Sequence, residues 1–184
     1  MKNLSSFAIA WLSLVTVFFS GCDKVDDLTD FEFHSDLEES IPVVDENTSD
    51  TEKAYSHDIL IDASTDTEIQ KYQSKIKSFK IDKISYTIDD SENKTKGVKF
   101  NGDLGFSASD GGSATILTTI TNLDLDDHTT VHEITLAPAD LDKIAGYLNT
   151  NRTFKVYLNG KVSKTPINII VNVKTEVTVV AKAL

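Results

Sequence analysis

The chain has 184 residues, of which 29 are Asp or Glu and 18 are Lys or Arg, so its formal net charge is -11 at pH 7. Binding nucleic acid or an anionic membrane by charge requires a positive surface, and this balance argues against both. A single cysteine excludes an internal disulfide, and the sequence has no Cys/His cluster of the kind that structural zinc sites use. The length suits one domain with a short extension.

Residues 1–21 have the pattern of a secretory signal peptide. Lys2 precedes an apolar stretch from Phe7 to Phe19, and Ser20, Gly21 and Cys22 follow it. The apolar stretch is too short to cross a hydrocarbon core of about 30 Å, and an acidic tract rather than a positive flank comes next. We therefore expect a cleaved signal and no retained transmembrane helix.

The segment Phe19-Ser20-Gly21-Cys22 resembles a bacterial lipobox. This resemblance implies that Cys22 is lipidated and becomes the first mature residue, so that acyl chains hold the protein on a membrane. The segment from Asp23 to Asp27 is similar to the export signal of surface lipoproteins in Bacteroidetes. It implies an outer-membrane or cell-surface location. An aspartate after the anchor can instead mark inner-membrane retention in other bacteria, so the leaflet stays open.

The negative charge is concentrated near this anchor. From Asp23 to Asp66 there are 15 acidic residues against Lys24 and Lys53, whereas the remainder of the chain after Asp66 is nearly balanced. A run of like charges repels itself and stays extended, which suits a tether. We expect a signal peptide at 1–21, an acidic tether at 22–30 and a folded domain at 31–184.

The first half of this domain predicts two strands, a loop and a helix. Apolar residues alternate with polar ones around Phe31 and Phe33, and again around Ile59 and Ile61, at the period of a strand. Residues 45–50 between them are turn-forming and predict a loop. A capping-box pattern and helical spacing then predict an amphipathic helix over residues 65–79, carried by Thr65, Glu68, Ile69, Tyr72, Ile76 and Phe79. Its outer lysines, Lys71, Lys75 and Lys77, are interpreted as a solvated face rather than an anion site.

The second half predicts further strands and one more helix. Period-two alternation recurs over residues 84–89, 98–108, 114–120, 131–136, 154–158, 167–173 and 177–183. Turn-forming residues predict tight turns at 110–112 and 159–161, and Gly102 predicts a bulge or a close backbone approach. Pro138 opens the helix, whose apolar stripe is Leu141, Ile144, Ala145 and Leu148.

These elements predict a mainly β fold, an antiparallel sandwich of about seven to nine strands with two short helices. The pattern resembles the immunoglobulin-like sandwiches of bacterial surface lipoproteins. The resemblance is one of architecture, because no cysteine pair brackets a buried tryptophan and the only tryptophan, Trp11, lies in the signal peptide.

The richest group of chemically active side chains is Asp124, Asp126, Asp127, His128 and His132. A calcium loop would need glycine where Thr129 stands and glutamate where Thr135 stands. A zinc or manganese site would require the loop to fold back on itself, and a solvated Asp-rich turn is the simpler interpretation. The sequence has no phosphate-binding glycine loop, dinucleotide fingerprint, nucleophile elbow or metalloprotease motif, so we expect no cofactor and no enzymatic role.

We therefore expect a lipid-anchored, extracytoplasmic sandwich that acts as a binding, adhesion or accessory module. Its partners are expected to be the membrane, through lipid on Cys22, and a glycan or an envelope protein, but not nucleic acid. The candidate binding loops are Asp89 to Thr95 and Asp124 to Thr130. The alternatives are a lipid-anchored hydrolase, metal-assisted around His128 and His132, and an envelope spacer without a small ligand. The oligomeric state stays open.

Overall fold

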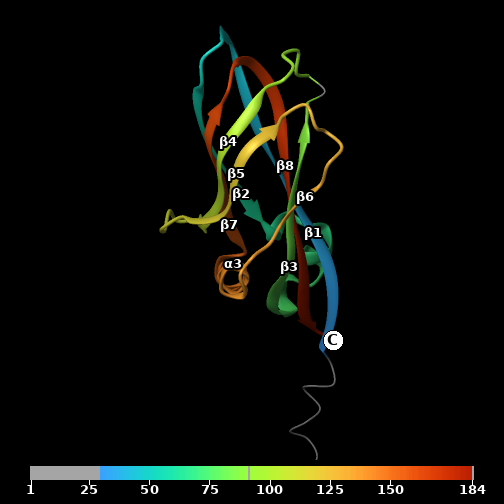
Figure 1. Ribbon diagram of the computed structural model, residues 1–184. Coiled ribbons are helices and arrows are strands. Elements are labelled where there is room, and N and C mark those ends of the chain that lie inside the picture. The colour runs from blue at the N-terminus through green and yellow to red at the C-terminus, as the bar shows by residue number, and fades with distance from the viewer. Residues whose placement is uncertain (1–29, 91, 184) are drawn as a thin grey trace, which may run out of the picture.

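The computed structural model describes residues 30–90 and 92–183, which form two antiparallel sheets of four strands each (Figure 1). The signal peptide, Cys22 and the tether up to residue 29 lie outside the described residues. Sheet A contains, in spatial order, β1 (Asp30–Ser49), β8 (Thr165–Lys182), β3 (Ile76–Asp89) and β6 (His132–Ile134). Sheet B contains β2 (Lys53–Asp62), β7 (Thr153–Val162), β4 (Lys99–Ala108) and β5 (Thr115–Asp124). The predicted antiparallel β-sandwich with seven to nine strands is confirmed.

The strands pair as one long hairpin folded over on itself. β1 pairs with β8, β2 with β7, β3 with β6 and β4 with β5, all antiparallel. The additional pairs, β3 with β8 and β4 with β7, join these into two sheets. This nested order of eight strands is that of a jelly roll. In an immunoglobulin sandwich the first two strands pair with each other, whereas here β1 and β2 lie in different sheets. Alternating residues identify strands but not their partners, so the sequence pattern could not distinguish these two orders.

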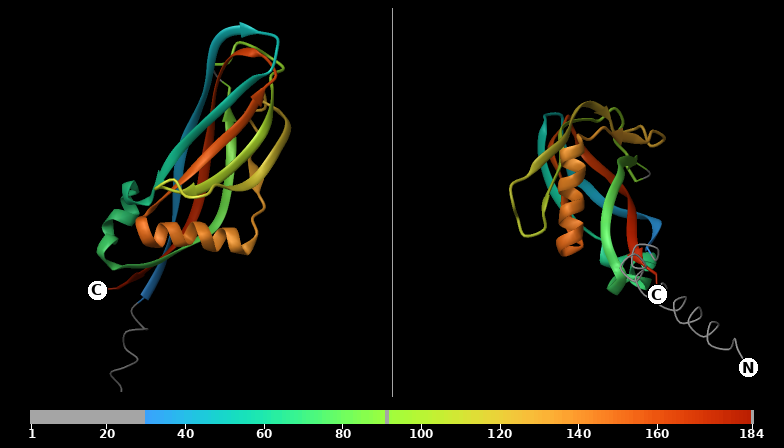
Figure 2. Two further views of the ribbon diagram at one scale, coloured as in Figure 1. Left: turned by 90° about the vertical axis from the view of Figure 1, so that its left-hand side faces the viewer. Right: turned by 90° about the horizontal axis from the view of Figure 1, so that it is seen from below.

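Helices connect the two sheets at one end of the sandwich (Figure 2). The chain passes from β2 to β3 through a 3-10 turn (Ala63–Thr65), the short helix α2 (Thr67–Lys71) and a second 3-10 turn (Gln73–Lys75). Helix α3 (Pro138–Asn151) connects β6 to β7, and its buried Ile144 and Leu148 close the core at this end. Pro138 opens α3 as predicted. Within the described residues, no helix is long and apolar enough to cross a membrane.

The helix predicted over residues 65–79 is wrong in its second half. Helix α2 ends at Lys71, and Ile76 already begins β3, in which Phe79 pairs with Val179. The helix is capped by Asp66, whose carboxylate accepts from the Ile69 N–H at 2.8 Å, and not by Thr65. The spacing of Ile76 and Phe79 fits a helix as well as a strand. The strand forms because pairing with β8 buries Phe79 in the core.

Two predicted turns are strand instead. β1 continues through Ser49 and so occupies all but the last residue of the loop predicted at 45–50, because residues up to Asp45 and then Ser49 pair with the start of β8. β7 continues through Val162, beyond the turn predicted at 159–161, because Gly160 pairs with Gly102 of β4. The absence of a side chain at Gly160 therefore allows β7 and β4 to lie close together. The close backbone approach predicted at Gly102 is confirmed. The predicted turn at 110–112 is present, with a φ of +91° at Gly111.

The core between the sheets contains one buried hydroxyl that lacks a partner. Thr175 of β8 is 0% exposed, and its Oγ1 makes no hydrogen bond. A hydroxyl buried in this way loses its bonds to water without compensation, which costs on the order of 1–3 kcal/mol. The same strand contains a contrasting residue, Thr178, whose hydroxyl donates to Asp82 at 2.6 Å.

We expect Thr175→Val to stabilise the protein by about 1 kcal/mol, because it keeps the shape and removes the unpartnered hydroxyl. Thr178→Val is the matched control and should destabilise by a similar amount, since it removes the hydroxyl that donates to the partly buried Asp82. Thermal or urea unfolding of both variants measures the difference. A decrease in stability for Thr175→Val would mean that this hydroxyl has a partner in solution.

Candidate functional site

The structure brings together the two loops singled out in the sequence, at the end of the sandwich far from the start of β1 (Figure 1). Asp90, which follows β3, is almost buried, and one of its carboxylate oxygens contacts a lysine while the other contacts a histidine. The Nζ of Lys96 lies 2.9 Å from Oδ2, and the Nδ1 of His128 lies 3.0 Å from Oδ1. The Lys96 ammonium holds the pKa of Asp90 below its usual value, and Asp90 in turn raises the pKa of Lys96. These contacts join residues 89–96 to residues 124–130.

The aspartates of the second loop mostly organise their own backbone. The Asp124 Oδ1 accepts from the Asp126 N–H at 3.1 Å, and the Asp126 Oδ2 accepts from the Gly97 N–H at 2.7 Å. The Asp127 carboxylate accepts from the hydroxyls and N–H groups of Thr129 and Thr130, which lower its pKa. The Asp-rich turn is therefore the arrangement that the structure shows. We call Asp90, Lys96, Asp126 and His128 the loop latch.

The two histidines proposed as metal ligands have different surroundings. His128 contacts Asp90, whereas His132 stacks on Tyr86 with ring centroids 4.7 Å apart. Among residues 30–90 and 92–183, no group of three His, Cys, Asp or Glu side chains is arranged to hold a metal ion. The described residues thus do not form the metal centre that a metal-assisted hydrolase would need.

We accordingly expect zinc, manganese and calcium to leave the thermal unfolding temperature of the protein unchanged. Binding of a metal to the folded state alone would raise that temperature in proportion to the logarithm of its concentration. Thermal scans with and without each ion, with a chelator as the baseline, make the comparison. A rise that disappears in a His128→Asn variant would restore the metal site.

A groove runs along the outer face of sheet A and ends at the loop latch. Its larger part has a volume of about 580 Å³ and its smaller part about 370 Å³, and the two share Thr87 and Asn172. The smaller part is bordered by Asp90 and His128. Three strands and one loop supply the remaining polar and apolar lining: Glu38, Glu39 and Ser40 from β1, Lys174 and Glu176 from β8, Lys83 and Ser85 from β3, and Val131.

The middle of the groove is neutral and rich in hydrogen-bonding groups. Ser40 donates to the Asn172 side-chain oxygen at 2.7 Å, and Asn172 is flanked in register by Ser40 and Thr87. Hydroxyl and amide groups can both donate and accept. This part of the groove can therefore bind a polar ligand, including the backbone of a polypeptide or the hydroxyls of a glycan.

A network of ion pairs crosses all four strands of sheet A and includes residues that line the larger part of the groove. Lys174 lies 2.6 Å from Asp36 and 3.6 Å from Glu176, while Lys83 lies 2.7 Å from Glu133 and 3.8 Å from Glu176. These carboxylates raise the pKa of both lysines. Because each lysine has carboxylate partners, the network does not present a strong positive charge to a ligand.

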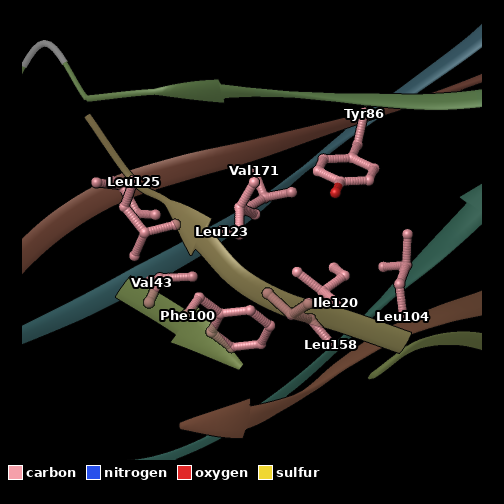
Figure 3. A pocket seen from close by; sticks show the side chains of 10 residues that line it. Val43, Tyr86, Phe100, Leu104, Ile120, Leu123, Leu125, Leu158 and Val171 are labelled. Carbon is pink, nitrogen blue, oxygen red and sulfur yellow. The ribbon is translucent and has the colours of Figure 1, made fainter. Parts of the chain in front are cut away.

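A second, internal cavity lies between the sheets but is too small for a ligand. Its volume is about 10 Å³, and Figure 3 shows apolar side chains from both sheets around it, with the Tyr86 ring also facing it. This is close to the least space that can hold one water molecule, and an apolar lining favours an empty cavity. Burial in this region raises the pKa of Tyr86. We assign this cavity to core packing.

Comparison with known proteins gives only distant structural likenesses. No protein-family model matches the chain, and no curated protein matches its sequence. A chain of Desmodium yellow mottle tymovirus is 8% identical, with a TM-score of 0.37, and the alignment covers 84% of this chain and 90% of that one. A chain of turnip yellow mosaic virus, from its structure at 100 K, is 8% identical with a TM-score of 0.32, covering 84% and 96%. A further turnip yellow mosaic virus chain is 8% identical with a TM-score of 0.33, covering 82% and 95%.

Sequence reasoning identified both loops but missed their partners. Lys96 and the groove residues Thr87 and Asn172 have no motif around them. Thr87 and Asn172 become neighbours only when β3 and β8 pair, and Lys96 contacts Asp90 only through the fold of the loop. The one available signal was that Lys96 follows Asp90 closely in a turn-rich segment. Such short spacing is common in loops and did not distinguish a site from a solvated turn.

Proposed function

We propose that this chain is a lipid-anchored, extracytoplasmic binding or accessory module without catalytic activity. The observation that carries the proposal is the polar groove on sheet A, which is bordered at one end by the loop latch. The lipobox-like segment ending at Cys22 supports the anchoring. The acidic segment after Cys22 supports a cell-surface location.

The arrangement of the chain suits such a role. Asp30 comes eight residues after Cys22, and the loop latch is at the opposite end of the sandwich (Figure 1). A tether at one end directs the other end away from the membrane. The groove would then be open to a partner, which we propose to be an envelope protein that places an extended segment along β3 and β8.

Anchoring is tested by the Cys22→Ser variant in the native host. We expect wild-type protein in the membrane fraction and the variant in the soluble fraction, because stable anchoring requires the acyl chains. Protease treatment of intact cells, with a periplasmic control that stays protected, tests the surface location. Variants of Lys24 to Asp27 should then become protected. Membrane association of Cys22→Ser without lipid would contradict the anchor.

The groove is tested by photo-crosslinking in cells. A photoreactive residue at Val131, which lines the groove and is 55% exposed, should give a discrete adduct with one envelope protein. The matched control is the same residue at Thr150, an exposed position of α3 outside the groove. Equal adducts at both positions, or none at Val131, would contradict the groove as a binding site.

The competing proposal is a hydrolase that needs no metal. It rests on the contact between the His128 Nδ1 and the almost buried Asp90, because a carboxylate at one ring nitrogen orients the other for proton transfer. Purified protein assayed with chromogenic esters and glycosides, beside His128→Asn, tests it. Turnover that His128→Asn abolishes would favour the hydrolase over the binding module.

A further inference from the structure

The outer face of sheet B has an aromatic ring lying across a glycine. A Cβ atom on Gly105 of β4 would lie 2.1 Å from the hydroxyl oxygen of Tyr157 and 2.2 Å from its Cζ. The ring therefore leans from β7 onto β4 and occupies the space where an outward side chain at residue 105 would be. Tyr157 is only partly buried, so the ring covers the sheet and also reaches solvent. Burial raises the pKa of Tyr157, and so does the nearby carboxylate of Asp103.

A row of polar side chains crosses the sheet beside this ring, one from each strand. In register these are Ser56 of β2, Asn159 of β7, Asp103 of β4 and Thr119 of β5. Thr119 donates to Asp103 at 2.7 Å, and Ser56 bonds to Asn159. The row thus presents hydroxyl, amide and carboxylate groups along one edge of the Tyr157 ring.

Exposed apolar side chains lie on the same face, although the β2 residue in register with Tyr157 is Asp58, whose carboxylate lies 2.8 Å from the Lys155 Nζ. Ile116, which pairs with Gly105, is 55% exposed, and Leu60 of β2 is 44% exposed. Only five large apolar side chains are classed as exposed among the described residues, and these two lie on the outer face of sheet B. An aromatic ring, exposed apolar groups and a line of hydrogen-bonding groups therefore lie on the outer face of sheet B.

We propose that this face, which we call the Tyr157 platform, binds a neutral saccharide. A pyranose has an apolar face of C–H groups and a rim of hydroxyls, which match the ring and the polar row respectively. Lys155 of this face is already paired with Asp58 at 2.8 Å, and Asp103 adds a further carboxylate, which disfavours sulfated or uronic-acid polymers by like-charge repulsion. The platform is on the opposite sheet from the groove, so the two sites can be occupied independently.

The test is depletion of the membrane-purified protein, in mild detergent, by immobilised polysaccharides. Glycogen, laminarin, mannan and xylan are the neutral probes, and chondroitin sulfate is the anionic one. We expect binding to at least one neutral polymer and none to chondroitin sulfate. Tyr157→Val should weaken that binding by about tenfold or more, whereas Tyr157→Phe keeps the ring and should stay within about twofold.

Two further variants separate the platform from folding and from the groove. Thr119→Val changes the polar row without touching the core and should weaken binding by a few fold, while Asn172→Ala in the groove should leave it unchanged. Thermal unfolding of each variant verifies that it is folded. The proposal is overturned if no neutral polymer depletes the wild type, if chondroitin sulfate alone does so, or if Tyr157→Val and Thr119→Val both bind like the wild type.

Discussion

Replacing Gly160 by alanine should destabilise the protein by about 3 kcal/mol, the largest effect of a single methyl group expected here. Its Cβ would lie 2.3 Å from the Asn101 carbonyl oxygen, 2.6 Å from the Phe100 Cζ and 2.7 Å from the Gly102 Cα. Two of these three atoms belong to the backbone of β4, so the clash is relieved only if β4 and β7 move apart. The separation would disturb the centre of sheet B, where β4 and β7 are the inner strands.

The matched control is Gly146→Ala in helix α3. Nothing lies within 4 Å of the Cβ that this change adds, and alanine is favoured over glycine in a helix by about 1 kcal/mol. We therefore expect Gly146→Ala to raise stability slightly, whereas Gly160→Ala and Gly102→Ala lower it. Denaturant unfolding of the three variants distinguishes the outcomes. If Gly160→Ala were as stable as Gly146→Ala, the close approach of β4 and β7 would not exist in solution.

Replacing Asp90 by asparagine should release the loop latch and cost about 1 to 2 kcal/mol. The change keeps the shape of the side chain but removes the charge that attracts Lys96, and it replaces one of the two oxygens that Lys96 and His128 contact by an amide nitrogen. The side chains of Lys96 and His128 are largely exposed, so they regain water and limit the loss. Faster hydrogen exchange of residues 92–97 and 124–130 should accompany the loss of stability.

The contribution of Asp90 should also depend on pH with a definite sign. Its pKa is held below 3.8 by the Lys96 hydrogen bond and charge, so folding favours the ionised carboxyl. The stabilisation is then fully present above about pH 4 and is lost as the pH falls through the lowered pKa. The difference in stability between wild type and Asp90→Asn should therefore shrink below pH 4. Asp124→Asn is a useful comparison, because Lys99 lowers the pKa of Asp124 outside the latch. A difference that persists unchanged to pH 2 would contradict the ion pairs.

The fold class and most of the strands could be predicted from the sequence because burial between two sheets imposes alternation on each strand. Phe154, Val156 and Leu158 all face the core, as their spacing predicts. The wrong predictions of secondary structure occur where the same residues fit both a helical and a strand pattern, or where a residue type is common in two kinds of structure. Ile76 and Phe79 fit a helix and a strand alike, and Gly160 suits a turn as well as a close approach.

The candidate sites were less predictable, because their residues come together only through pairing of distant strands. Asp90 and His128 were each within a loop of interest, yet their 3.0 Å contact depends on how β3 and β5 end. Asn172 and Thr87 are neighbours across the β8–β3 pair although they are far apart in sequence. Tyr157 appeared only as a strand residue, and its place over Gly105 follows from the β4–β7 register.

The sequence alone therefore determined the local properties of this protein: which segments alternate as strands, which of their residues face inward, where the charge lies, and the lipobox-like segment before residue 23. These depend on the order of neighbouring residues, which the chain carries directly. The tertiary structure decided the jelly-roll order, the extent of β1, β3 and β7, the latch, the groove and the Tyr157 platform. All of these depend on which strands pair and in which register, and pairing is settled by the total burial and hydrogen bonding of segments far apart in the chain.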